Sequence, residues 1–142
     1  MPSVFDSIQM FDFSHFMSVA DHLVGHSAEG HWRSAVSRAY YAVYHSALAY
    51  ATRRGYKPFA DDLGLPRANL PSLARAGAHR RLVVWYTHHA HDHVRRAGLE
   101  LERLLDLRQK ADYEARVAVS SATASQAVQD CKDLLADITR LP

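Results

Sequence analysis

Apolar side chains recur at helical spacing along most of the chain. The first such segment runs from Phe13 to Val24 and predicts a helix of about four turns. Gly25 is expected to end this helix, and either Ser14 or Asp12 is placed to cap its start.

A longer helix is predicted from about Ala28 to Arg54, with Gly55 as its stop signal. Its apolar stripe is wide, and Tyr41, Tyr44 and Leu48 carry apolar surface further round the helix. A helix that is apolar on most sides is expected at the centre of a bundle. The stripe consists of Trp32, Ala35, Val36, Ala39, Tyr40, Val43, Ala47 and Ala51.

Residues 56–77 hold three of the five prolines and two of the six glycines, which indicates a connection with at most short helical turns. The continuous apolar run 82–86 that follows has the character of a strand when taken alone. Since no other segment offers a strand to pair with it, we predict a buried helical turn there.

Two further helices complete the pattern, one leading to Tyr113 and one opening near Ser120 or Ser121. The last is the most clearly amphipathic segment, and the single cysteine, Cys131, falls on its apolar stripe as a small core residue. The predicted fold class is all-α. We expect one domain over residues 1–142, an up-and-down bundle of four long helices plus one short helix.

Composition narrows the class of protein further. With 48% hydrophobic and 23% charged residues in 142, the chain is typical of a folded globular protein, and its net charge of +2 does not by itself indicate a nucleic-acid binder. The start of the chain lacks the pattern of a secretory signal, and no apolar run approaches the roughly 20 residues that span a bilayer. A cytoplasmic protein without membrane contact is therefore expected.

The most informative position is Arg108, which falls on an apolar stripe. Leu101, Leu104 and Leu105 share one helical face, and the next positions on that face are Arg108, Ala111 and Asp112. A guanidinium directed at a core is costly unless it is paired or lines a cleft. Two interpretations follow: Arg108 and Asp112 satisfy each other, or both belong to a site.

As a site, the segment would form a phosphate clamp. Arg108 would hold a phosphodiester through two parallel hydrogen bonds, with Gln109 beside it. Asp112 would orient the guanidinium or act as a base, and Tyr113 would bind phosphate or donate a proton. The plainer alternative is an ion pair between residues four apart, plus a packed tyrosine. On the residues alone, that alternative is favoured.

Arg38 raises the same question inside the helix expected to be most buried. It needs a carboxylate, and Asp112 is the candidate, so that both arginines would share one acid. Tyr41 and His45 lie close to the face of Arg38. A buried bridge between two helices and a groove lined by arginines and tyrosines are compatible interpretations.

Histidines invite a metal hypothesis, because His89 and His93 are four residues apart, as are His22 and His26. No helical zinc signature accompanies them, so solvated polar faces are favoured. The chain also lacks a nucleophile elbow, a phosphate-binding glycine loop and a dinucleotide fingerprint. We predict neither a metal site nor a cofactor.

Two segments together resemble the HEPN superfamily (higher eukaryotes and prokaryotes nucleotide-binding domains). They are residues 37–47, Ser-Arg-Ala-Tyr-Tyr-Ala-Val-Tyr-His-Ser-Ala, and residues 107–113, Leu-Arg-Gln-Lys-Ala-Asp-Tyr. The resemblance implies a helical bundle that forms a homodimer with the motif helices near the two-fold axis. Many members of the family are metal-independent endoribonucleases, acting as toxins or defence effectors, often paired with a minimal nucleotidyltransferase antitoxin.

The ribonuclease motif of that family is an arginine, a polar residue and then a histidine. Arg108 and Gln109 match the first two positions, while Asp112 and Tyr113 stand where the histidine is expected, as is common in the small standalone branch. A tyrosine with a pKa near ~10 is a poor base at neutral pH. Two other arginine–histidine pairs, at 38 and 45 and at 81 and 88, are chance matches to the spacing.

The resemblance therefore predicts an RNA- or nucleotide-binding protein that acts as an endoribonuclease toxin or defence effector. Its binding groove is expected to hold the residues named above: Arg38, Tyr41, His45, Arg108, Gln109, Asp112 and Tyr113. The alternative is a non-catalytic helical module that docks a nucleotidyltransferase.

Overall fold

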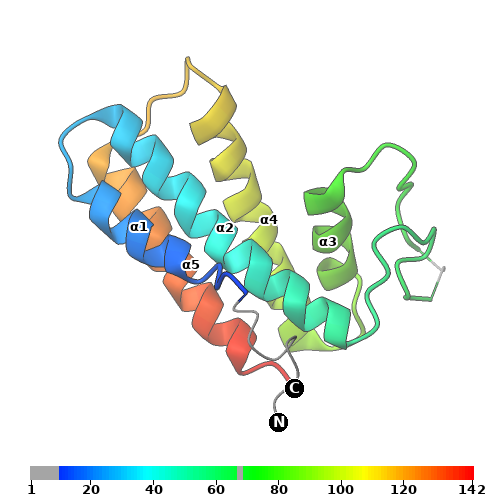
Figure 1. Cartoon of the computed structure of the whole chain (residues 1–142). Coiled ribbons are helices and arrows are strands. Elements are labelled where there is room, and N and C mark those ends of the chain that lie inside the picture. The colour runs from blue at the N-terminus through cyan, green and yellow to red at the C-terminus, as the bar shows by residue number, and fades with distance from the viewer. Residues whose placement is uncertain (1–9, 67–68) are drawn as a thin grey trace, which may run out of the picture.

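The computed structural model of the protein describes residues 10–66 and 69–142 (Figure 1). These residues form five helices and contain no strand. The predicted all-α class is confirmed for these residues. The expectation that the chain begins without a secretory signal concerns residues outside this part. The helices are α1 (His15–Val24), α2 (Glu29–Arg53), α3 (Ala78–Thr87), α4 (Asp92–Tyr113) and α5 (Ser121–Thr139).

Helix α2 lies at the centre and contacts each of the other four helices. Figure 1 shows α1, α4 and α5 running alongside it, with α3 on the flank formed by α2 and α4. Its buried side chains point in many directions, as the wide apolar stripe predicted. They are Ala35, Val36, Ser37, Ala39, Tyr40, Ala42, Val43, Tyr44, Ala47, Tyr50 and Ala51.

Helix α1 is shorter than its apolar pattern predicts. It has 10 residues, as many as α3, whereas α2, α4 and α5 have 25, 22 and 19. The chain before it forms a turn in which the Asp12 carboxylate accepts a hydrogen bond from the backbone N–H of Ser14 at 2.9 Å. The division into four long helices and one short one was wrong: the described residues form three long helices and two short ones.

The apolar run 82–86 is helical and buried within α3, so the preference for a helical turn over a strand is confirmed. The hydroxyl of Tyr86 donates to the carbonyl of Ala47 at 2.7 Å and ties α3 to α2. Gly98 lets α4 approach α3 closely, because a Cβ at that position would lie 2.6 Å from Cβ of Tyr86.

The connection between α2 and α3 contains no helix in residues 54–66 and 69–77. It leaves α2 at Gly55, whose φ of 94° suits a residue without a side chain. The guanidinium of Arg81 holds it in place by donating to the carbonyls of Pro58, Ala60 and Leu73. Arg81 is therefore a structural residue, and its spacing from a histidine carries no functional meaning.

Two expectations from composition can be compared with the fold. Cys131 is 1% exposed in the core, and burial raises the pKa of its thiol to about 12, which makes it a packing residue. None of the helices among the described residues combines the length and the apolar character that crossing a bilayer requires.

Candidate anion-binding site

Arg108 lies on the buried face of α4 and is 5% exposed, as its place on the leucine stripe predicts. Its Nε is fully buried, and no acceptor among the described residues reaches it. A buried N–H without an acceptor costs roughly 1–3 kcal/mol. Such a group in a native fold calls for an explanation, and a ligand is one.

The carboxylate of Asp112 is near Arg108 without satisfying it. Nη1 of Arg108 lies 3.6 Å from Oδ2 of Asp112, which is an ion pair beyond hydrogen-bond distance. The same Oδ2 accepts the hydroxyl of Ser37, on α2, at 3.0 Å. The predicted pairing of Arg108 with Asp112 is therefore present but loose, and α2 holds part of the carboxylate.

Three tyrosine rings surround the guanidinium. Its Cζ lies 5.3 Å from the ring centre of Tyr40, 5.5 Å from Tyr41 and 5.8 Å from Tyr113. These distances are within the range of cation–π attraction. Tyr40 is 1% exposed whereas Tyr113 is 75% exposed, so the cluster extends from the core to the surface.

Arg38 does not share Asp112, which corrects the expected bridge between the two. Its guanidinium instead lies 5.0 Å from the ring centre of Phe16 and 5.6 Å from that of Tyr41. The reason is the helical phase of α2: Ser37 faces Asp112, and the next residue is turned about 100° away, toward α1. Arg38 thus adjoins the cluster through the Tyr41 ring alone.

The other two predicted residues lie at the edge or outside. His45 stacks on Phe13, with ring centres 3.6 Å apart, and burial lowers the pKa of its imidazole. Its ring centre is 6.4 Å from that of Tyr41. Gln109 is exposed on α4 and makes no hydrogen bond with any described residue of the site. Four predicted residues are therefore gathered: Tyr41, Arg108, Asp112 and Tyr113.

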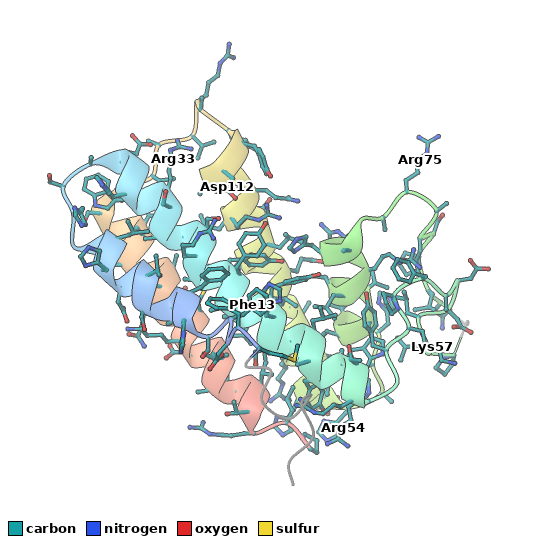
Figure 2. The ribbon with its side chains drawn as sticks, in the orientation of Figure 1. Phe13, Arg33, Arg54, Lys57, Arg75 and Asp112 are labelled. Carbon is teal, nitrogen blue, oxygen red and sulfur yellow. The ribbon has the colours of Figure 1, made fainter. Side chains whose placement is uncertain are left out.

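Arg33 is a structural support that the sequence analysis missed. Its guanidinium donates to the carbonyls that end α4 and open the next loop, those of Lys110, Ala111, Glu114 and Val117. Glu29 accepts from Nε of Arg33 at 3.0 Å and from the backbone N–H of Val119 at 3.0 Å. Figure 2 shows Arg33 and Asp112 at the same end of α2 and α4, so this clamp fixes the helix end that carries Asp112 and Tyr113.

His79, from α3, is the second residue that was missed. Its Nδ1 lies 2.7 Å from the hydroxyl of Tyr40, and its ring centre is 4.1 Å from that of Tyr44. Burial lowers the pKa of its imidazole to about 4, and the charge of Arg108 and the nearby His45 act in the same direction. No motif pointed to His79, because it reaches the cluster only through the packing of α3.

Histidines within residues 88–93 accept hydrogen bonds from the backbone. Nδ1 of His89 accepts from the N–H of His91, and Nδ1 of His91 accepts from the N–H of His93 as the cap of α4. Because α4 begins at Asp92, His89 and His93 are not four apart on one helix. No group of three metal-ligating side chains occurs among the residues that the structure describes.

A surface hollow lies next to the site. It has a volume of about 420 Å³ and is lined by Arg33, Asp112 and Tyr113, together with Glu29, Gly30, Ala111, Glu114 and Ala115. A larger one, about 670 Å³, lies under the connection before α3 and includes none of the gathered residues.

Comparison of the chain with protein-family models, curated proteins and solved structures gives no match.

Proposed function

We propose that this chain is a HEPN-type protein that binds RNA or a nucleotide through a phosphate held at Arg108. The observation that carries the proposal is the buried guanidinium whose Nε has no acceptor among the described residues. A phosphodiester offers two anionic oxygens in the geometry of a guanidinium fork, so it would satisfy donors that the fold leaves open.

The surroundings of Arg108 support this role. Asp112 stands 3.6 Å away and is held by Ser37, so it orients the guanidinium without occupying its donors. Tyr113 is the exposed ring of the cluster. Because Arg108 is 5% exposed, a phosphate reaches it only when side chains of the cluster move aside.

We further propose metal-independent endoribonuclease activity in a toxin or defence effector. Cleavage requires a base for the 2′-hydroxyl, an acid for the leaving oxygen and a cation for the pentavalent phosphate. Arg108 supplies the cation, and Tyr113 positions the phosphate or transfers a proton. The resemblance to HEPN proteins adds a homodimer and a minimal nucleotidyltransferase antitoxin as partner, and light scattering of the purified chain measures the first.

The test is digestion of RNA by the purified protein in the presence of a chelator. The wild type is expected to cleave, and Arg108→Ala to lose cleavage. Arg103→Ala is the matched control, because Arg103 lies on the same helix and pairs at the surface with Glu100 and Asp130. Undiminished cleavage by Arg108→Ala, at the rate of this control, would rule the assignment out.

The alternative is a non-catalytic module in which the cluster only holds α2 against α4. The enclosure of Arg108 by three tyrosines is the observation that favours it. Urea unfolding of Arg108→Ala distinguishes the two proposals. Breaking a buried ion pair typically costs about 3–5 kcal/mol, whereas a residue kept for a ligand is replaced with little loss of stability.

A further inference from the structure

His79 and Arg108 meet the same two tyrosine rings from different helices. The ring centre of His79 lies 5.5 Å from that of Tyr40 and 5.8 Å from that of Tyr41. The guanidinium of Arg108 lies 5.3 and 5.5 Å from these two rings. A phosphate held at Arg108 would therefore stand close to the imidazole as well.

Burial and the charged and titratable groups around His79 explain the protonation state of its imidazole without a ligand. Helix α2 presents Tyr40, Tyr41, Tyr44 and His45, and α4 presents Arg108. No carboxylate pairs with His79 among the described residues, and Asp112 lies beside Arg108, bound to Ser37. Burial lowers the pKa of the imidazole most, and with a positive neighbour and no negative one the ring is neutral at neutral pH.

We propose that His79 is a second anion-binding residue of this site and takes up a proton when a phosphate is held at Arg108. The proposal rests on the proposed function. The bound anion cancels the repulsion from Arg108 and adds an attraction of its own, both of which favour the charged imidazole. Binding of the anion and binding of the proton then strengthen each other, so affinity rises as the pH falls.

The contact with Tyr40 serves both states of the imidazole. A hydroxyl is both donor and acceptor, so Tyr40 donates to Nδ1 when His79 is neutral and accepts from Nδ1–H when it is charged. In either case Tyr40 fixes the ring and Nε2 carries a hydrogen that can be donated to the ligand, while only the charged ring adds electrostatic attraction.

The probe is a 2′-O-methyl oligouridylate, which lacks the hydroxyl needed for cleavage. Its phosphodiester and uracil groups keep one charge state from about pH 5 to pH 8, where an ordinary histidine titrates. For the wild type, affinity is expected to rise as the pH falls, and the total rise is tenfold for each unit by which binding raises the pKa of His79. His79→Gln should flatten this slope, and His93→Gln, an exposed histidine at the start of α4, should keep it.

A titration of the imidazole resonances of the unaltered protein gives a second reading that needs no variant to fold. The pKa of His79, about 4 in the free protein, is expected to rise by at least about one unit with saturating probe. Binding that depends on Arg108 while His79 titrates unchanged would overturn this inference and leave the proposed function standing. Absence of binding, or equal binding by Arg108→Ala, would overturn both.

Discussion

Ser37 donates its hydroxyl to Oδ2 of Asp112 at 3.0 Å and so bonds α2 to the acid that faces Arg108. The carboxylate stays 3.6 Å from the guanidinium, too far for a hydrogen bond. The hydrogen bond from Ser37 keeps Asp112 from forming a closed ion pair, which would use the donors of the guanidinium. Arg108 is therefore oriented and retains free donors.

Replacing Ser37 by alanine is expected to let Asp112 move onto Arg108. Affinity for the oligouridylate should fall roughly threefold to tenfold, since the carboxylate then competes with the phosphate, and the free energy of unfolding should change by about 1 kcal/mol. Titration of the probe and urea unfolding measure the two effects. Ser34→Ala, an exposed serine on α2, is the control. Unchanged affinity in Ser37→Ala would contradict the role of this hydrogen bond.

Asp112→Asn tests the charge of the acid separately from its shape. The amide keeps an oxygen for Ser37 but removes the negative charge that repels a bound phosphate, so affinity for the probe should rise several-fold. Stability should fall by about 1–3 kcal/mol, because the buried Arg108 loses its counter-charge. Asp106→Asn, which breaks an exposed pair with Lys110 on the same helix, should leave affinity unchanged. Weaker probe binding by Asp112→Asn would count against this repulsion.

The stability of the free protein should depend on the protonation of His79. Its pKa is about 4 in the fold and 6.5 in the unfolded chain, so the unfolded chain binds the proton first as the pH falls. The contribution of His79 is therefore complete above pH 6.5 and is lost as the pH falls from there toward 4. Urea unfolding across this window should show a shallower decline for His79→Gln than for the wild type. Equal declines would show that other groups cause the loss.

Gly98→Ala is expected to destabilise the protein by about 1–3 kcal/mol, because the new methyl group would collide with α3. The nearest atom, Cβ of Tyr86, lies 2.6 Å from the added carbon. Gly30→Ala is the matched control: nothing lies within 4 Å, and alanine is the better helix former, so it should stabilise. Thermal unfolding of both variants gives the comparison, and a neutral Gly98→Ala would refute the close approach of α3 and α4.

Helical periodicity predicted much of the fold because apolar side chains recur at helical spacing along most of the chain. The wide stripe of α2 placed it at the centre, and the leucine stripe of α4 placed Arg108 inside. The start of α1 was missed because Phe13 continues the apolar pattern into a turn that Asp12 stabilises through the N–H of Ser14. Side-chain pattern does not distinguish a last helical turn from a packed aromatic next to it.

Apart from Tyr41 on α2, the site was predictable only along a single helix. Spacing brought Arg108, Asp112 and Tyr113 together because they are neighbours on α4. It could not reveal Ser37, Arg33 or His79, which enter the site through the rotation and packing of other helices. The expected Arg38–Asp112 bridge failed for the same reason, since one residue of helical phase decides whether Ser37 or Arg38 faces the acid.

The most direct measurement is the Nε–H resonance of Arg108, assigned with an Arg108→Lys variant, as the oligouridylate is added. In the free protein this N–H has no acceptor among the described residues. A phosphate that engages the guanidinium should shift the resonance along a curve that saturates with the Kd of probe binding. A resonance that stays in place while the probe saturates the protein would show that Arg108 is not the anion-binding group.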